Sequence, residues 1–496
     1  MAKTSLFFST GRSQGLIQHV LDNHLLLGND HTQLLSVKGE LNVIYFNHNV
    51  NKLVFGRDIF ARKSLCWRIT TDERDSSKCV LQLSVFPADV SKEGWHELFP
   101  GTFFVLQLSD EESKSVEFRP NPRMPLNTLS TDLFCHFSAL STLETSIQYS
   151  HVNASHLLQP TSSAILTSDI DQLVEATAKE FNHRLESAVR GLQLETEMGQ
   201  NRIVRVLFSG GVDSLMVAIQ LGNVLPLDID ILLINVAFGD SEADCSEAPD
   251  RKRGIKAFKY LKLTETSAKG ISSRYRLVLV NVNKQELSEC RTKYIAPAIF
   301  PLNSVLDDSL GCVLWFASRG KGLEYIEEAG QLKASPEKTP SHLQVVHHVT
   351  VVGSGADEQL GGYGRHRTVF EKLGFDGLAA ELGRELTRIG LRNFGRDDRV
   401  VTSNGKIALA PFLEEDFVEW LNQVPLSFKV DFSLPRGYGE KRLLRRALLQ
   451  LNVPLDLAHS PKQAMQFGSK IAKLENRKEK GSDVCSRLKD TISIDE

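Results

Sequence analysis

Apolar residues follow one pattern in the first third of this 496-residue chain and another in the rest. Up to about residue 160 they form short runs, at 42–46, 52–56, 79–85 and 101–108, which are typical of strands. Asn47-His48-Asn49 supplies turn residues between the first two runs, so the pattern predicts a hairpin. Residues 119–165 are rich in Pro, Ser, Thr and Asn, and we expect a linker there.

From Ser168 onward, helical stripes alternate with continuous apolar runs. The first stripe predicts a helix with Ser168 as its N-cap and comprises Ile170, Leu173, Val174, Phe181, Leu185, Ala188, Val189 and Leu192. Buried strands are predicted at 203–208, 229–236, 276–280 and 345–352, with helices after the first three, two of them starting at Pro249 and Lys284. This alternation predicts a doubly wound parallel sheet, whose ligands bind at the carboxyl ends of its strands. Residues 324–344 are polar and predict a surface loop.

The composition of the chain limits the classes of binding partner and the cellular compartment that we expect. The net charge of −3 argues against a general nucleic-acid binder. No apolar run reaches the roughly 20 residues of a membrane helix, and the N-terminus lacks the apolar core of a signal peptide. The seven cysteines are scattered without paired spacing, which indicates reduced thiols rather than disulfides or zinc. We therefore expect a cytoplasmic protein with neither nucleic acid nor membrane as partner.

Ser209-Gly210-Gly211 follows the strand predicted at 203–208 and precedes a helix. A helix N-terminus reached through glycines presents unpaired N–H groups to an anion, and Ser209 and Ser214 add hydroxyl donors. Asp213 would repel a phosphate unless Mg²⁺ lies between them, so the pattern predicts a loop that binds nucleotide pyrophosphate with a metal. The Gly-Lys-Ser/Thr ending of a Walker loop is absent. The alternative is an ordinary strand–turn–helix junction.

A second glycine-rich segment, 353–358, follows the strand predicted at 345–352 and contains Asp357 and Glu358. Gly361, Gly362 and Tyr363 come shortly after. If this segment lies beside the first loop, Asp213 and Asp357 can share one Mg²⁺ on the phosphates. The alternative is a flexible glycine loop with solvated acids.

Three charged segments follow. Residues 392–399 contain both signs of charge, and taken alone they are typical of a solvated surface. Residues 441–446 form a basic helix segment. Lys462 comes directly after Pro461 and can reach a phosphate or a carbonyl oxygen as a point charge, the alternative being an ordinary surface lysine.

Together these segments resemble the synthetase domain of the asparagine synthetase family. The matching segments, in chain order, are 209–214, 315–322, 353–358 with 361–363, 392–399, 411–414 and the segment around Lys462. Residues 55–65 and 460–469 resemble a divergent branch of that family. The resemblance implies two domains. Residues 1–160 would form a degenerate, truncated class II glutamine-amidotransferase-like domain of α+β class, together with its linker. Residues 161–496 would form an α/β ATP-pyrophosphatase (PP-loop) synthetase domain.

The family's chemistry implies asparagine biosynthesis: ATP adenylates the β-carboxylate of aspartate, pyrophosphate leaves, and ammonia displaces AMP. Carried over by position, pyrophosphate would be held by Ser209, Gly210, Gly211 and Ser214. Asp213 and Asp357 would hold Mg²⁺, and the adenosine site would be lined by Phe208, Val236, Val352 and Gly353. Lys462 would stabilise charge that develops on the phosphates. Glu358 and Arg396 are the other candidate catalytic residues.

The chain departs from the family pattern in its first domain. The family hydrolyses glutamine with an N-terminal cysteine, whereas Ala2 stands here and the nearest cysteine is Cys66. The family's Arg-Gly and Asn-Gly-Glu segments for glutamine are missing, and only 38–108 resembles that domain. A nucleophile needs an activating base and an open site, and no such arrangement is evident. We expect that the chain has no glutaminase of its own.

The acid-binding segments depart as well. Ser354 replaces a glutamate common in the family, and Ile407 and Leu409 stand where glutamate and arginine usually precede Pro411. Two hypotheses therefore remain open. One is an ATP- and Mg²⁺-dependent amide ligase that acts on aspartate or a related acid with ammonia. The other is an inactive homologue that serves as a nucleotide-binding or interaction scaffold. A PP-loop enzyme acting on tRNA is disfavoured by the net charge of −3.

We predict that glutamine does not support amide formation, because Ala2 replaces the cysteine and the glutamine-binding segments are missing. The purified protein should release no glutamate from glutamine above a protein-free blank. Release above that blank would contradict the prediction.

Overall fold

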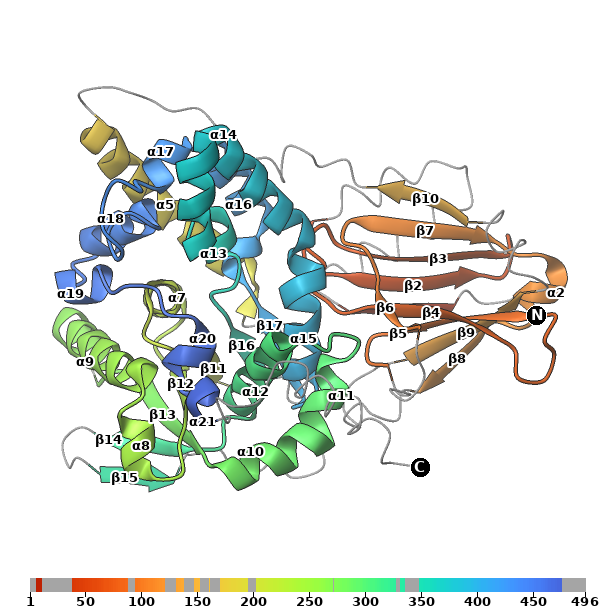
Figure 1. Cartoon of the computed structure of the whole chain (residues 1–496), viewed down its shortest axis with the longest axis horizontal. Helices are drawn as coiled ribbons and strands as arrows, with labels where there is room; N and C mark the ends of the chain where they lie inside the picture. The colour runs from red at the N-terminus through yellow and green to blue at the C-terminus, as the bar shows by residue number, and fades with distance from the viewer. Residues whose placement is uncertain are drawn as a thin grey trace.

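The computed structural model describes residues 6–10, 38–87, 94–120, 131–137, 147–151, 160, 170–194, 202–270, 272–326, 331–334 and 348–474. They form a mixed α/β protein in which a β-rich N-terminal part lies beside a larger α/β part (Figure 1). In the portion of the chain that is described, none of the helices combines the length and the apolarity needed to cross a membrane.

The N-terminal part contains two five-stranded antiparallel sheets. The first has the order β1 (Leu6–Thr10), β2 (Asn42–Asn47), β3 (Lys52–Arg57), β7 (Thr102–Gln107) and β10 (Ile147–His151). The second has the order β6 (His96–Glu97), β4 (Cys66–Thr71), β5 (Cys79–Ser84), β9 (Thr131–Phe137) and β8 (Glu117–Pro120). Helix α2 (Asp110–Ser113) follows β7. Ile44, Phe55 and Leu83 belong to one apolar cluster fed by both sheets, so the sheets pack against each other.

Two predictions for this part have different outcomes. The hairpin is confirmed, because β2 and β3 pair antiparallel with Asn47 opposite Lys52. The linker predicted at 119–165 is wrong where β9 and β10 lie, since these strands pair with β5 and β7. Leu133, Cys135 and Phe137 are buried at every second position of β9, an alternation that the polar composition of the segment conceals.

The larger part is organised around a seven-stranded sheet. Its order is β15 (Gln331–Ala334), β14 (Leu323–Ile326), β13 (Tyr275–Val282), β12 (Asp230–Phe238), β11 (Ile203–Leu207), β16 (His348–Val351) and β17 (Lys406–Leu409). Neighbours from β13 to β17 are parallel, which confirms the predicted parallel sheet. The chain passes from β11 outward to β12 and β13, then returns to the other side of β11 with β16 and β17. The point between β11 and β16 is therefore a topological switch point.

The surface loop predicted at 324–344 is wrong in part. β14 pairs antiparallel with both β13 and β15, so the described residues of this segment form an edge hairpin of the sheet. The remaining residues, 327–330 and 335–344, lie outside the described part of the chain.

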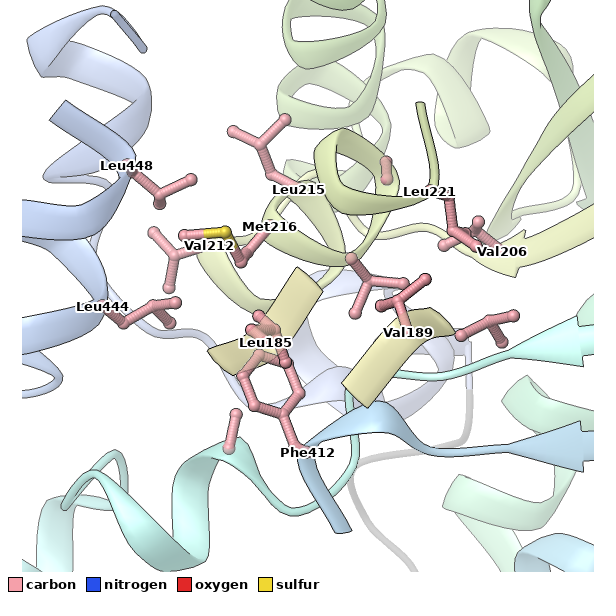
Figure 2. Close-up of a cluster of buried hydrophobic side chains, with 14 of the residues drawn as sticks. Leu185, Val189, Val206, Val212, Leu215, Met216, Leu221, Phe412, Leu444 and Leu448 are labelled. Atoms are coloured by element: carbon pink, nitrogen blue, oxygen red, sulfur yellow. The ribbon is translucent and has the colours of Figure 1, made fainter. Parts of the chain in front are cut away.

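Helices cover both faces of the sheet, because alternate side chains of each strand point to opposite sides. Val206 on one face joins a cluster with α5 (Ile170–Gly191), α7 (Val212–Val224), α9 (Pro249–Lys269), α16 (Glu415–Gln423) and α18 (Arg442–Gln450). Figure 2 shows Val206 with Leu185, Val189, Met216 and Leu444 from these helices. Ile234 on the other face packs with α10 (Lys284–Cys290), the π-helix η2 (Arg291–Ile295), α11 (Ala296–Ile299), α12 (Val305–Arg319), α15 (Gly395–Thr402) and α21 (Ile471–Leu474).

The stripe predicted for α5 is confirmed except at Leu173, which is exposed. Ser168, its expected N-cap, lies outside the described residues. The remaining elements of the larger part are α8 (Glu242–Ser246), α13 (Ala356–Gln359), α14 (Gly364–Ile389), the π-helix η4 (Gly390–Phe394), the 3-10 helix η5 (Pro411–Leu413), α17 (Leu426–Lys429), α19 (Leu455–Ala458) and α20 (Met465–Gly468).

A buried charge network joins the two parts. The Arg62 guanidinium, between β3 and β4, bonds to Asp58 at 3.0 Å and also to Glu415, and it donates to the Leu413 carbonyl at 2.9 Å. Lys63 lies 3.5 Å from Asp398. Residues 394–399 are buried, so the view of this run as a solvated surface is wrong there, although Arg392 is exposed. Asp398 and Arg399 pair across the interface with Lys63 and Glu97, which one segment of sequence cannot reveal.

Arg62→Met should lower the free energy of unfolding by about 3–5 kcal/mol, because it leaves buried carboxylates without their cation. Lys38→Met is a matched control, since the Lys38–Asp416 pair crosses the same interface but is 59% and 79% exposed. That change should cost less than about 1 kcal/mol. Urea unfolding would measure both, and equal losses would contradict the assignment.

Candidate functional site

The two glycine-rich loops meet at the switch point. One leaves the carboxyl end of β11 and the other that of β16, which is its parallel neighbour. A Cβ atom on Gly353 would lie 3.0 Å from Asp213 Cβ and 3.5 Å from the backbone nitrogen of Ser214. The loops are thus in contact, which meets the condition for Asp213 and Asp357 to act together, and a side chain on Gly353 would be tightly packed here.

The first loop is shaped by helix α9. Gly210 has φ +72°, and a Cβ there would lie 2.6 Å from the backbone of Arg253 and Gly254. Asn235 Nδ2 donates to the Phe208 carbonyl at 2.9 Å and so links the loop to β12. Gly211 is the N-cap of α7 and makes no side-chain cap, so the first turn of α7 offers its N–H groups to a ligand.

The two serine hydroxyls of the loop bond within it. Ser209 Oγ accepts from the Gly211 N–H at 3.2 Å, and Ser214 Oγ donates to the Gly211 carbonyl at 3.1 Å. They hold the glycine turn in shape.

Two lysines neutralise the two aspartates. Lys441 Nζ lies 2.6 Å from both carboxylate oxygens of Asp213 and 2.6 Å from Asp357 Oδ1. Lys462 Nζ bonds to the other oxygen, Asp357 Oδ2. The contact with Asp357 Oδ1 is an ion pair rather than a directed hydrogen bond. Both carboxylates therefore point at one cationic centre.

The electrostatics keep Asp357 ionised. Burial disfavours its charged form, but Lys441 and Lys462 outweigh burial and hold the pKa of Asp357 well below its usual range. Burial also disfavours the charged form of Lys462, yet Asp357 and Asp213 raise the net pKa of that ammonium group. Lys462 is thus paired with Asp357 rather than free on the surface, and its role in a functional site stays a prediction.

Sequence reasoning missed Lys441, which it assigned to a basic helix segment. Lys441 precedes α18 and has a fully buried side chain. No signal in the sequence marks Lys441; in the structure, a Cβ on Gly362 would lie 2.0 Å from Asp357 Oδ1 and 2.3 Å from Lys441 Cε. This glycine makes room for the lysine stem beside the carboxylate.

Arg253 in α9 was also missed. Its guanidinium donates to the Ser209 carbonyl at 3.4 Å and to the Pro461 carbonyl at 3.3 Å, and it pairs with Asp250. Arg253 therefore connects the first loop with the segment that carries Lys462. In the sequence it is one of several basic residues of α9, with nothing to distinguish it.

Glu358 is buried beside the acid pair. The Tyr363 hydroxyl donates to Glu358 Oε1 at 2.6 Å, and Asn393 Nδ2 donates to the same oxygen at 2.9 Å. Burial, and then the neighbouring Asp357 charge, raise the pKa of Glu358. Lys462 Nζ lies 5.5 Å from the centre of the Tyr363 ring, so the lysine and Glu358 flank one tyrosine.

The other predicted residues lie around this cluster. The Arg396 guanidinium is bound to Asp397, at 2.7 and 2.9 Å, and to Asp307 at 2.6 Å, so its described contacts join α15 to α12. Its catalytic role stays a prediction. Phe208, Val236 and Val352 are buried in three different apolar clusters, and their contact with adenosine also stays a prediction.

Comparison with known proteins identifies the family. A family model described as asparagine synthase matches residues 373–486. Asparagine synthetase domain-containing protein 1 of Gallus gallus is 34% identical over 95% of this chain and 85% of its own, and that of Homo sapiens is 31% identical over 95% and 83%. The chain belongs to the asparagine synthetase family. A protein named putative asparagine synthetase [glutamine-hydrolyzing] 1, from Methanocaldococcus jannaschii, is 25% identical over 61% of this chain and 52% of its own.

The asparagine synthetase family implies Mg²⁺, and the acid pair fits it. The Asp213 and Asp357 oxygens already converge on a cation, the Lys441 ammonium group. Across the described ranges, no group of three or more His, Cys, Asp or Glu side chains is placed to hold a metal. Mg²⁺ commonly uses one or two carboxylates and completes its shell with phosphates and water, which suits a two-carboxylate site.

Cys66 has no features of the family's glutamine-hydrolysing nucleophile. It is buried between the two parts, where Arg399 lies 3.6 Å from its sulfur. Burial, and then Glu97, raise the pKa of the Cys66 thiol to about 12 despite Arg399, so the thiolate does not form near neutral pH. Ala2 lies outside the described residues.

Gly362→Ala should displace Lys441 or Asp357 and destabilise the protein by about 1–3 kcal/mol, as overpacking does. Gly364→Ala is the matched control, because a Cβ at Gly364 meets nothing within 4 Å. Thermal unfolding of both variants would measure the effect. Similar behaviour of the two variants would contradict this account of Gly362.

Proposed function

We propose that the chain is an ATP- and Mg²⁺-dependent amide ligase that adenylates aspartate or a related carboxylate and then aminates it with free ammonia. The observation that carries the proposal is the convergence of Asp213, Asp357, Lys441 and Lys462 on the glycine loop at the switch point. Ligands of such sheets bind there. Opposite charges in one buried place suit a metal–phosphate complex, which needs partners of both signs.

In this proposal residues 161–496 form the PP-loop synthetase domain. Ser209, Gly210, Gly211 and Ser214, with the first turn of α7, bind the phosphates, and Phe208, Val236, Val352 and Gly353 line the adenosine site. Asp213 and Asp357 hold Mg²⁺, which when bound neutralises phosphate charge. Lys462 stabilises the charge that moves onto pyrophosphate when its bond to the α-phosphorus breaks.

Glu358 is assigned the proton that ammonia must lose after it attacks the acyl carbon. A carboxyl group with a raised pKa suits a proton acceptor near neutral pH, and Tyr363 and Asn393 orient it. Arg396 has a positioning role in this proposal, because its ion pair with Asp307 holds α15 against α12.

Residues 1–160 are proposed to be the degenerate glutamine-amidotransferase-like domain, and ammonia rather than glutamine the amine donor. Burial of Cys66 supports this choice. The identity of the carboxylic acid substrate is left open among aspartate and related acids. Leu409 is buried in the hydrophobic core and offers no charge that could bind the substrate. The second candidate is a catalytically inactive homologue, a nucleotide-binding or interaction scaffold, and Ser354 in place of the family's glutamate favours it.

The first test is ligand-dependent stability and turnover. ATP with Mg²⁺ at about 100 times its Kd should add about 2.7 kcal/mol to the free energy of unfolding and raise the Tm. Pyrophosphate should be released from ATP with aspartate and ammonium. A Tm shift without pyrophosphate release from any acid tried would favour the scaffold. The absence of both the Tm shift and pyrophosphate release would contradict nucleotide binding itself.

Asp213→Asn and Lys462→Met separate binding from chemistry. Asp213→Asn removes a charge that the metal needs in ground and transition state, so ATP affinity should fall. Lys462→Met leaves Asp357 paired with Lys441, so ATP binding should stay within a few-fold while pyrophosphate release falls by about 10²–10³. Calorimetry and a pyrophosphate assay measure the two effects. Normal ATP binding by Asp213→Asn, or unchanged turnover by Lys462→Met, would contradict the assigned roles.

A further inference from the structure

We propose that Lys441 is an internal counter-ion that keeps Asp213 and Asp357 from binding a bare divalent cation, so that metal binds only together with phosphate. The inference rests on the nucleotide-binding part of the proposed function. It concerns the order and the coupling of binding rather than the reaction catalysed.

The position of Lys441 is built into the fold. Its side chain is fully buried, and its backbone N–H donates to the Leu360 carbonyl at 3.1 Å. Its backbone has φ +54° and ψ 33°, a left-handed conformation that non-glycine residues adopt at a cost. Gly362 leaves the space through which the lysine stem passes. A strained backbone and a cleared path both serve to place this ammonium group between the two carboxylates.

Among its described contacts, the Lys441 ammonium group has no anion other than Asp213 and Asp357. Glu440, the preceding residue, accepts from the Gly437 N–H at 2.7 Å and pairs with Arg445. The Arg445 guanidinium in turn donates to the carbonyls of Ala458 and Ser460. Glu440 is thus committed to other partners, and Asp213 and Asp357 are the anions that Lys441 contacts.

Displacement by a bare metal is therefore unfavourable. A divalent cation that takes the two carboxylates leaves a buried ammonium group without its counter-charge, which is costly in a poorly solvated place. A metal that arrives with phosphate brings new acceptors for Lys441 and Lys462. Metal and phosphate should then strengthen each other's binding, by an equal factor for each as linkage requires.

The test measures Mn²⁺ binding to the full chain by electron paramagnetic resonance, with and without inorganic pyrophosphate. The parent protein should bind Mn²⁺ weakly alone, and pyrophosphate should tighten binding by roughly 5- to 150-fold, the usual range of coupling between sites. Lys441→Met should bind Mn²⁺ alone at least about tenfold more tightly than the parent, with reduced coupling to pyrophosphate.

Two further variants serve as controls. Lys441→Arg keeps the charge and should keep bare Mn²⁺ binding weak. Lys462→Met removes a lysine whose described carboxylate contact is Asp357 alone and whose side chain is 27% exposed, so bare Mn²⁺ affinity should change less than in Lys441→Met. If Lys441→Met does not fold, the parent and Lys441→Arg still decide the question through the coupling between Mn²⁺ and pyrophosphate.

Equal Mn²⁺ affinity with and without pyrophosphate in a parent protein that binds pyrophosphate, or unchanged bare Mn²⁺ affinity in a folded Lys441→Met variant, would overturn the inference. Failure of the proposed function gives a different result. If pyrophosphate and ATP bind to no variant, nucleotide binding fails, whereas tighter bare Mn²⁺ binding by Lys441→Met still supports Lys441 as the counter-ion.

Discussion

The structure of the site depends on two carboxylates that meet at the ends of neighbouring parallel strands. Asp213 and Asp357 repel each other in a place largely shielded from water, and this repulsion has to be offset by cations. Lys441 and Lys462 provide that offset from segments more than 80 residues further along the chain. Gly353 and Gly362 follow from the same constraint, because side chains at either position would force the charged groups apart.

The N-terminal part supports this arrangement from a distance. Arg62 donates to the Leu413 carbonyl. A Cβ on Gly355 would lie 2.6 Å from Leu413 Cδ2, so the Leu413 side chain occupies the space beside this glycine. Gly355 has φ +97° and turns the second loop into the helix that presents Asp357. The charge network at the interface thus helps to hold the glycine-rich segment 353–358, which contains Asp357, in position. The N-terminal part, in which burial raises the pKa of the Cys66 thiol to about 12, thus contributes packing and charge pairs to the larger part.

Much of the fold was predictable because its main signals are local. A continuous apolar run followed by glycines marks β11 and the start of α7, and helical spacing marks α5. The prediction failed where the surrounding composition is polar. β9 was taken for linker because residues 119–165 are rich in Pro, Ser, Thr and Asn, although Leu133, Phe134, Cys135 and Phe137 of β9 are apolar. β14 and β15 lie at the edge of the sheet, where polar residues are tolerated.

By itself, the sequence determined the loop chemistry, the alternating strands and helices and the resemblance to the asparagine synthetase family, because each depends on residues close together in the chain. It also singled out Asp213, Asp357, Glu358 and Lys462. Only the tertiary structure decided which cations face these acids. Lys441 and Arg253 look like surface bases until the chain folds. The structure also shows that the Arg396 guanidinium is bound to Asp397 and Asp307, while its catalytic role stays a prediction. The physical reason is that the energy of a charge pair depends on the distance between the charges in space and not on their separation along the chain.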